Sequence, residues 1–363
     1  MSSSCGRAIA LLAFIATGCE ALPTEPLPPL SDLPPGLAAM SFTATGNATA
    51  RYFMLELRSA AFDGFVAVNG NGEPVWTFPT TGSPFGFTVR ANGNFVLHDS
   101  GRGLVEVRPD GKVVRELTRE SAGTDIHHDV TVTPQNTVLF ISTDVQSPNG
   151  TAITGEAIRE WLPESGTVVK RWTSFDALDP DVDRSTRSTD DDWLHANSIA
   201  LGSRGNILLS LHFLDQVISI APGFDGIEWR LGGVNADIVV DDPFSGQHTA
   251  QEVAGGNILV FDNGFDRAEP YSRAVEYDPS GRLVWEWRPE RGNWARVISG
   301  ARRLPNGNTV VAFGTPADSP PGSTGPIEVY EVTRAGEVVW HLEVGGDVRS
   351  MYRATPLTGI GRR

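Results

Sequence analysis

Three histidines of this sequence are spaced as members of one site would be. His128, His195 and His248 stand eight to eleven positions before the Asn of a turn motif that recurs along the chain, and Phe85 and Ser299 hold the matching positions of two further copies. Imidazole titrates near neutral pH, so it can act as a nucleophile, a proton acceptor or, when protonated, an anion-binding group. If each turn belongs to one structural repeat, the three imidazoles point into one shared space.

Other interpretations of the histidines stay open at this point. A lone histidine in a β-protein is often a structural residue, and three histidines can hold zinc, with Asp129 and Asp192 assisting. The chain has no His-x-x-x-His pair, and a histidine cluster that binds an anion needs no metal. We therefore expect neither a metal nor a cofactor. His98 and His341 fall at other phases of the repeat, so we expect them to be structural.

Two short units alternate along the chain. In the first, a Gly turn precedes an apolar strand that often ends in Trp; its six copies end at positions 76, 115, 170, 229, 285 and 340. In the second, a Gly-Asn or similar turn precedes another apolar strand, as in the copies Asn92–Leu97, Gln135–Phe140, Gly205–Leu209, Gly256–Val260 and Asn306–Val311. Repeats of this length, rich in short strands and tight turns, are typical of propeller blades.

The sequence therefore predicts an all-β fold, a six-bladed β-propeller. No long stretch has the periodicity of a helix, which disfavours a parallel α/β fold. The innermost strand of each blade should lie just before the Gly-Asn turn, where the three histidines fall. We expect the ring to close by pairing sequence near residues 50–70 with the C-terminal strands.

Composition and charge exclude some classes of partner and site. The 363 residues carry a formal net charge of −15, so nucleic acid is an unsuitable partner, because phosphate binding requires a basic face. Any anion site must be local, built from a few Arg, His or backbone donors. Cys5 and Cys19 are the only cysteines, so no disulfide is expected in the folded body.

The N-terminus resembles an export signal. Arg7 precedes an apolar run at 8–16 that is too short to span a bilayer, and Ala16-Thr17-Gly18-Cys19 resembles a lipobox. We expect a lipoprotein signal peptide at 1–19 with lipidation at Cys19, a Pro-rich tether at 20–40 and the propeller at 41–363. An ordinary cleaved signal is the alternative. The predicted location is the periplasm or the cell surface, with membrane contact through the lipid anchor only.

Five local motifs carry a resemblance to a known family: His127-His128-Asp129-Val130, Asp192-Trp193-Leu194-His195-Ala196-Asn197, Gln247-His248-Thr249-Ala250-Gln251, Phe261-Asp262-Asn263-Gly264 and Met351-Tyr352-Arg353-Ala354. Over roughly residues 65–356 the chain resembles the bacterial arylsulfate sulfotransferases. The resemblance implies a six-bladed propeller that transfers a sulfuryl group from an aryl sulfate donor to a phenolic acceptor, with neither a nucleotide sulfate donor (PAPS) nor a metal.

The resemblance also implies roles for individual residues in a ping-pong reaction. His248 matches the family nucleophile that becomes a sulfohistidine, and His128 and His195 match the other two active-site histidines. The substrate-binding residues that we expect are His127, Asn197, His212, Tyr352 and Arg353. Acid–base assistance by a histidine is typically worth about 10²–10⁴ in rate.

Two departures from the family pattern leave alternatives open. His212 stands where the family carries an active-site Arg, so either His212 or a nearby Arg such as Arg273 binds the sulfate, or the substrate or activity has changed. Residues 38–65 are too few for the separate N-terminal β-domain of better-known members, which leaves the oligomeric state undetermined. A non-catalytic envelope scaffold is the main alternative function. A quinone- or metal-dependent oxidoreductase propeller is disfavoured, because its Trp-docking repeats and acidic metal site are not evident.

Overall fold

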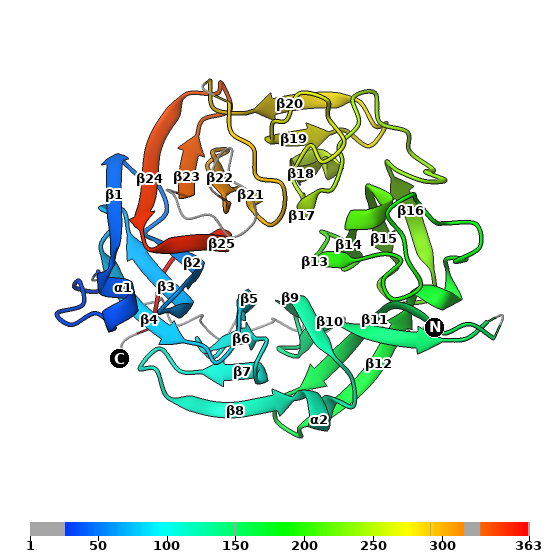
Figure 1. Cartoon of the computed structure of the whole chain (residues 1–363), viewed down its shortest axis with the longest axis horizontal. Coiled ribbons are helices and arrows are strands. Elements are labelled where there is room, and N and C mark those ends of the chain that lie inside the picture. Colours follow the sequence, from blue (N-terminus) through cyan, green and yellow to red (C-terminus); the bar gives the residue numbers. More distant parts are fainter. Residues whose placement is uncertain (1–25, 149, 291, 316–326, 362–363) are drawn as a thin grey trace, which may run out of the picture.

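Six antiparallel sheets stand as blades around a central axis in the computed structural model (Figure 1). The structure describes residues 26–148, 150–290, 292–315 and 327–361. The predicted six-bladed β-propeller is confirmed. Cys19 and the predicted signal peptide lie outside the described residues.

The strands of each blade run from the channel outward in the following order. The first blade holds β25 (Val348–Leu357), β2 (Tyr52–Ser59), β3 (Asp63–Asn69) and β4 (Pro74–Pro79). The second holds β5 (Pro84–Val89), β6 (Phe95–Asp99), β7 (Gly103–Val107) and β8 (Val113–Thr118), and the third holds β9 (Ile126–Val132), β10 (Val138–Gln146), β11 (Ile153–Leu162) and β12 (Thr167–Thr173).

The fourth blade holds β13 (Ala196–Leu201), β14 (Ile207–Leu211), β15 (Gln216–Ile220) and β16 (Ile227–Leu231), and the fifth holds β17 (His248–Glu252), β18 (Ile258–Asp262), β19 (Arg273–Tyr277) and β20 (Leu283–Trp287). The sixth has five strands, β21 (Gly300–Arg303), β22 (Thr309–Phe313), β23 (Ile327–Val332), β24 (Val338–Gly346) and β1 (Met40–Gly46). Helices are confined to α1 (Pro35–Ala38), α2 (Arg119–Ala122) and the 3₁₀ turns Ser174–Asp176, His212–Leu214 and Ala254–Gly256 among the described residues.

The two repeated sequence units correspond to fixed positions in the blades. The Gly turn and Trp-ending unit forms the fourth strand of every blade, and the Gly-Asn unit forms the second strand of blades two to six. The first blade lacks a Gly-Asn copy because its innermost strand, β25, arrives from the other end of the chain.

The ring closes where the two ends of the chain meet. Strand β2 pairs with β25 along Tyr52–Ser59, and β1 adds to the outer edge of β24, so the predicted closure through residues 50–70 is confirmed. At this seam the rings of Phe53 and Trp340 stack with their centroids 4.2 Å apart, and both side chains are fully buried. Closing a sheet ring in this way removes strand edges from water.

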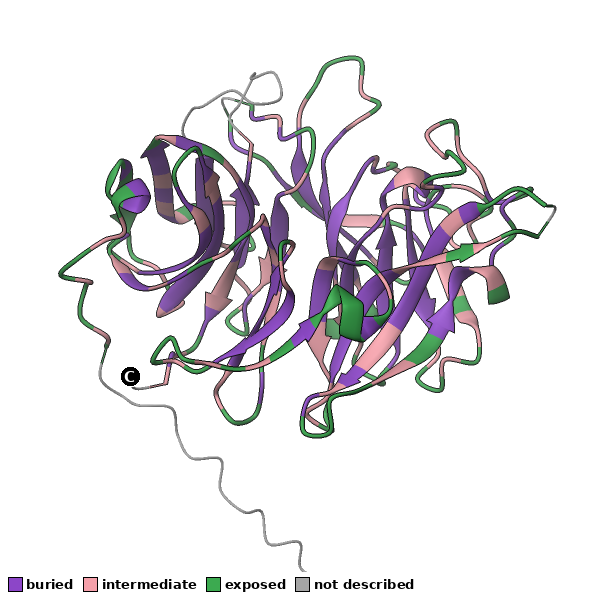
Figure 2. Ribbon diagram, turned by 60° about the horizontal axis from the view of Figure 1, so that its bottom comes forward, coloured by how far each residue is buried: buried purple, intermediate pink, exposed green. Residues whose placement is uncertain are grey.

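Apolar side chains fill the space between each pair of neighbouring blades. Six buried clusters do this, one at each junction, and Figure 2 shows the strands as mostly buried. The recurring Trp adds a polar link at three junctions. The indole N–H groups of Trp76, Trp285 and Trp340 each donate to a carbonyl in the outer hairpin turn of the next blade, at 2.9, 3.0 and 2.7 Å.

The described part of the predicted tether is packed against the propeller rather than extended into solvent. Leu37 is fully buried in the cluster at the ring closure, and Leu27 and Leu33 pack against neighbouring clusters. The backbone N–H of Leu27 also donates to the Tyr52 hydroxyl at 2.7 Å. The apolar residues between the prolines explain this contact, because their burial is favourable.

Candidate active site

The histidines lie at the channel-facing start of the innermost strands. At this point the pairing of β9, β13 and β17 with the next strand is interrupted by a β-bulge. His128 and His195 have φ of +54°, and Thr249 beside His248 has φ of +51°, which is left-handed backbone that a branched or bulky residue seldom adopts. Bulges redirect side chains and are frequent next to active sites.

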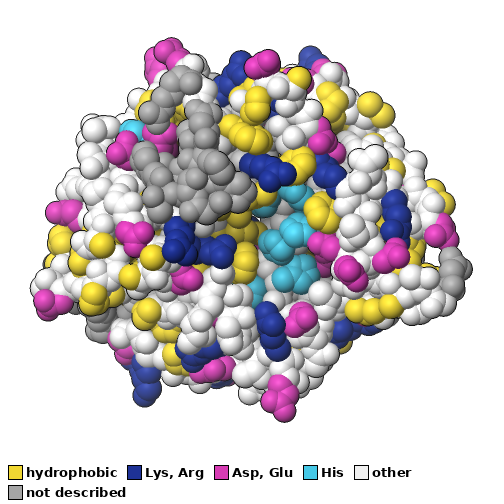
Figure 3. Space-filling model, in the orientation of Figure 1, with side chains coloured by type: hydrophobic (Ala, Val, Ile, Leu, Met, Phe, Trp, Pro, Cys, Tyr) yellow, Lys and Arg dark blue, Asp and Glu magenta, His cyan; other side chains and the backbone are white. Residues whose placement is uncertain are grey.

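Four imidazoles form a continuous row around one mouth of the channel. The ring centroids of His128 and His195 are 4.9 Å apart, those of His195 and His212 are 5.4 Å apart, and those of His212 and His248 are 5.2 Å apart. Tyr352 closes the row on the inner side, with its ring 6.1 Å from His128 and 6.4 Å from His248. Figure 3 shows the histidines together in a hollow on this face, with Arg or Lys side chains nearby.

His248 is held in a single tautomer. The amide nitrogen of Asn263 donates to the carbonyls of Ala295 and Ile298 at 2.6 and 3.0 Å, so its oxygen must face His248. That oxygen lies 2.9 Å from Nδ1 of His248, which therefore carries the proton. The lone pair is left on Nε2, where it accepts a hydrogen bond from the N–H of Ile298 at 3.1 Å.

Burial keeps His248 uncharged. Its side chain is almost fully enclosed, and burial lowers its pKa to about 3, against the smaller raising effect of the Asn263 hydrogen bond. A neutral imidazole with a directed lone pair is the form that can act as a nucleophile.

His128 is connected to a carboxylate through His127. The Nδ1 atoms of the two rings are 2.9 Å apart, and Nε2 of His127 lies 2.8 Å from Glu156. Burial, followed by His195 and His127, holds the pKa of His128 well below its usual range. Burial also acts to lower the pKa of His127, but the Glu156 carboxylate outweighs it and the pKa is raised.

His195 is paired with Asp192. Its Nδ1 lies 2.5 Å from one carboxylate oxygen, and its backbone N–H donates to the other at 3.0 Å. Asp192 is the last member of the acidic run 190–192, whose first two residues are exposed. The carboxylate orients the ring.

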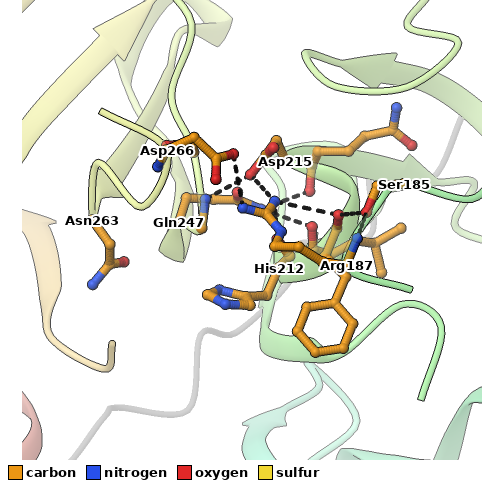
Figure 4. A network of polar contacts seen from close by, with 12 residues as sticks. Ser185, Arg187, His212, Asp215, Gln247, Asn263 and Asp266 are labelled. Carbon is orange, nitrogen blue, oxygen red and sulfur yellow. Dashed lines mark hydrogen bonds and ion pairs between the residues drawn. The ribbon is translucent and has the colours of Figure 1, made fainter. Parts of the chain in front are cut away.

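His212 is an uncharged substitute for the family Arg. Burial lowers its pKa strongly, with further lowering by His248, so it brings no positive charge to the site. Figure 4 shows its neighbour Arg187, which donates to the carbonyl of His212 at 3.0 Å and forms ion pairs with Asp215 and Asp266. Arg187 therefore stabilises the loop around His212 and has its charge neutralised by two carboxylates.

A second arginine at this mouth has no such partner. The guanidinium of Arg296 lies 4.8 Å from the centre of the Phe265 ring, whose centroid is 5.8 Å from that of His212. Arg296 is exposed, and no described carboxylate forms an ion pair with it. It is therefore a cation available to an anion that approaches the histidines.

A polar layer forms the floor of the histidine site. The Tyr352 hydroxyl donates to the carbonyl of Asn197 at 2.7 Å, and Arg353 forms an ion pair with Asp129 at 2.9 Å. The Asn197 amide donates to the carbonyl of Gln247 at 2.7 Å, and its side-chain oxygen is buried without a partner in the described structure. These side chains cross the channel and divide it in two.

The remaining candidates from the sequence fall outside the site or beside it. Arg273 lies on β19 and is committed to Asp262, Asp242 and Glu286 at 2.9, 2.6 and 2.8 Å, so it is not available to bind sulfate. His341 bonds to Glu328 in blade six. His98 bonds through Nδ1 to the carbonyl of His128 at 3.2 Å and so supports the site from behind.

Several residues of the site were not identified from the sequence. Glu156 and Arg296 come from segments with no recognisable motif, and Arg187 comes from a long loop between blades. Asn263 belongs to one of the matching motifs, but nothing in that motif alone indicates that it orients His248. Within the described ranges, no group of three His, Cys, Asp or Glu side chains is arranged to hold a metal ion, and no helix is long and apolar enough to cross a membrane.

Fold and site together define a class of protein, a six-bladed propeller with a histidine-lined channel mouth. The family model described as Arylsulfotransferase (ASST) matches residues 40–353, and the chain belongs to this family. The family supports arylsulfotransferase function in general and implies an aryl sulfate donor and a phenolic acceptor.

Two solved structures are similar to this chain at low sequence identity. A protein of unknown function from Bacteroides caccae is 17% identical, with a TM-score of 0.56, over 85% of this chain and 100% of that chain. A catalytically inactive virginiamycin B lyase from Staphylococcus aureus, solved with quinupristin, is 10% identical with a TM-score of 0.44, over 84% of this chain and 99% of that chain. The first of these likenesses supports the propeller fold. No curated protein sequence matches this chain.

Proposed function

We propose that this protein transfers a sulfuryl group from an aryl sulfate to a phenol in two steps, through a sulfohistidine at His248. The observation that carries the proposal is the fixed tautomer of His248, which leaves an uncharged lone pair on Nε2, where only the Ile298 N–H rests among the described residues. The row of three further imidazoles beside it supplies the groups that both half-reactions need.

In the first step, Nε2 of His248 attacks the sulfur of the aryl sulfate. An N–S bond forms, the S–O bond to the aromatic ring breaks, and the aryl oxygen leaves with the electron pair. The sulfur replaces the Ile298 N–H that rests on Nε2 at 3.1 Å. His195, held by Asp192, is positioned to give a proton to the departing oxygen.

In the second step, a phenol attacks the sulfur of the sulfohistidine. His128 accepts the phenol proton, and the N–S bond breaks to restore His248. The contact from His128 through His127 to Glu156 orients the His128 ring. This arrangement follows the logic of a base oriented by a second group and a carboxylate. The gained proton then returns from His128 to His195, whose ring centroid is 4.9 Å away, and this restores the site for the next cycle.

Sulfuryl transfer depends on stabilising the charge of the equatorial oxygens, as phosphoryl transfer does. His212 is uncharged and Arg187 is neutralised by its ion pairs, so neither provides that charge at rest. We propose that Arg296 attracts the sulfate and that His212 contributes a neutral hydrogen bond. The Tyr352 ring lies against His128 and His248 and forms part of the aromatic wall for the substrate.

The direct test is to trap the intermediate. The soluble protein is incubated with 4-nitrophenyl sulfate without a phenol, digested, and examined by mass spectrometry for a sulfated peptide. We expect sulfate on the peptide that contains His248 and its loss when phenol is added. His341→Gln, which removes an imidazole from blade six, is the matched control and should still be sulfated. A folded protein with no sulfated peptide across a panel of aryl sulfates would favour a non-catalytic scaffold.

A further inference from the structure

The channel contains a second cavity on the far side of the polar floor. It has a volume of about 790 Å³ and is lined by the latter halves of all six innermost strands, together with residues 49–51. Asp129 and Arg353, which belong to the floor, form its inner end. We call this space the distal cavity, because the floor separates it from the four histidines.

Its lining is basic although the protein is acidic. Four arginines and two carboxylates line the distal cavity, in a protein whose formal net charge is −15. The charged lining residues are Arg51, Arg302, Arg303, Arg353, Asp129 and Glu252. A cleft lined by an excess of one charge concentrates ions of the opposite sign.

The positive charge of Arg302 in the distal cavity is not balanced by an ion pair with a described residue. Arg353 is paired with Asp129 at 2.9 Å, and Arg303 is paired with Glu276 at 2.6 Å. The half-buried Arg302 forms no hydrogen bond or ion pair with any residue that the structure describes. A guanidinium that is removed from water without a counter-charge is costly, so this position favours an anionic ligand.

Besides Asp129, which is paired with Arg353, Glu56 is the acid whose charge would act on Arg302, and it does not supply the counter-charge. Glu56 on β2 is fully buried, and both of its carboxylate oxygens lack a hydrogen-bond partner among the described residues. Burial raises the pKa of Glu56 well above its usual range despite the opposing effects of Arg353 and Arg302. A protonated Glu56 leaves the positive charge of Arg302 intact.

The walls around Arg302 are largely apolar. Val130, Ile199, Leu201 and Leu304 line the distal cavity from three different blades. A volume of this size lies in the range of pockets that hold small organic ligands, and such pockets typically combine apolar walls with a few polar anchors. An inorganic ion alone would leave these walls in contact with water.

We propose that the distal cavity binds an organic anion whose carboxylate, sulfonate or sulfate group pairs with Arg302 and whose apolar body lies against the inner-strand side chains. This site is separate from the histidine mouth, and the proposal does not depend on the proposed function. Because the floor lies between the two sites, the bound anion does not take part in sulfuryl transfer.

The test uses 2-naphthalenesulfonate, an aromatic anion. Its sulfonate group is attached through a C–S bond, so the proposed reaction cannot transfer that group to histidine. Its binding to the full soluble protein is measured by isothermal titration calorimetry. We expect Arg302→Gln to weaken binding by about tenfold or more, as loss of a charge-assisted hydrogen bond does. Leu201→Trp, which fills the cavity while keeping Arg302, should also weaken binding. Arg204→Gln, which removes an exposed arginine elsewhere, should bind as the wild type does.

The outcomes decide the proposal. Loss of binding in both Arg302→Gln and Leu201→Trp, with unchanged melting temperatures, supports a ligand inside the distal cavity. Wild-type binding in both variants overturns the proposal, as does a wild-type protein that does not bind the probe. Binding that is lost in Arg296→Gln and retained in Arg302→Gln would place the probe at the histidine mouth, which also overturns it.

Discussion

At the scale of single residues, Asn263 and burial together set the tautomer and the charge of His248. Asn263 fixes the tautomer and burial keeps the ring neutral, with a pKa lowered to about 3. The sequence was sufficient to group His128, His195 and His248, because each is at the same phase of a repeat. It was not sufficient to identify Asn263, Glu156 or Arg296, because their roles arise from contacts between distant segments.

Replacing Asn263 with a carboxylate should change the pH dependence of the reaction. In Asn263→Asp, a negative charge next to Nδ1 raises the pKa of His248, by about 1–3 units for a charge at such a distance. A protonated His248 cannot attack sulfur, so the acid limb of the kcat/KM profile should move to higher pH. The profile is measured with 4-nitrophenyl sulfate and phenol. A lower rate with an unshifted profile would mean that Asn263 acts only in folding.

Arg296 should affect the binding of the donor more than the chemical step. In Arg296→Gln, the mouth loses an arginine that has no ion pair with any described residue, and we expect KM for the aryl sulfate to rise about tenfold. The value of kcat should change little, because the Arg296 guanidinium contacts the substrate at the edge of the channel mouth and not at the reacting atoms. Arg204→Gln is the matched control. Equal KM values for both variants would remove Arg296 from the account.

At the scale of elements, the blades are joined by the same kind of contact at several junctions. A Trp on the fourth strand of a blade donates its indole N–H to the hairpin turn of the next blade. The repeat made these Trp residues visible in the sequence and indicated packing between blades. The hydrogen-bond acceptors could not be predicted, because they are backbone carbonyls on the following blade and no sequence motif marks them.

The Trp at the ring closure should contribute more to the free energy of unfolding than a Trp at another junction between blades. Trp340 is fully buried, stacks on Phe53 and donates to Gly70, so Trp340→Ala should cost roughly 3–5 kcal/mol of unfolding free energy. Trp229 occupies the same place in blade four but is only half-buried, so Trp229→Ala should cost less. Chemical denaturation of the two variants makes the comparison. Equal losses would contradict the view that the closure depends on Trp340.

At the scale of the whole molecule, the propeller brings four imidazoles together in a row at one mouth of its channel. The fold class, the six blades and the ring closure could all be predicted from repeat spacing, since each blade reuses the same turns and strands. The packing of residues 26–39 on the first blade could not, because prolines without periodicity are compatible with both an extended and a packed segment. The location of the protein and the lipid at Cys19 stay predictions.

Burial of uncharged His248 should make the fold sensitive to acid. Its pKa of about 3 in the folded state lies below the ordinary 6.5 of the unfolded chain, so between these values the unfolded state binds more protons. Above pH 6.5, His248 does not lower the free energy of unfolding. As the pH drops below 6.5, protonation of the unfolded state lowers this free energy, by roughly 2 kcal/mol at pH 5. Denaturation at pH 7.5 and pH 5 should show a smaller difference for His248→Gln than for the wild type. An equal difference between the two pH values in both proteins would contradict a buried, neutral His248.

The most direct measurement is release of 4-nitrophenolate from 4-nitrophenyl sulfate, with and without phenol, for the wild type and His248→Ala. The account predicts release that depends on phenol, that is accompanied by phenyl sulfate formation, and that disappears in His248→Ala while the variant remains folded. Phenol-dependent release that survives in His248→Ala would contradict the assignment of His248 as the nucleophile. No release from the folded wild type across a panel of aryl sulfates would contradict aryl sulfotransferase activity itself.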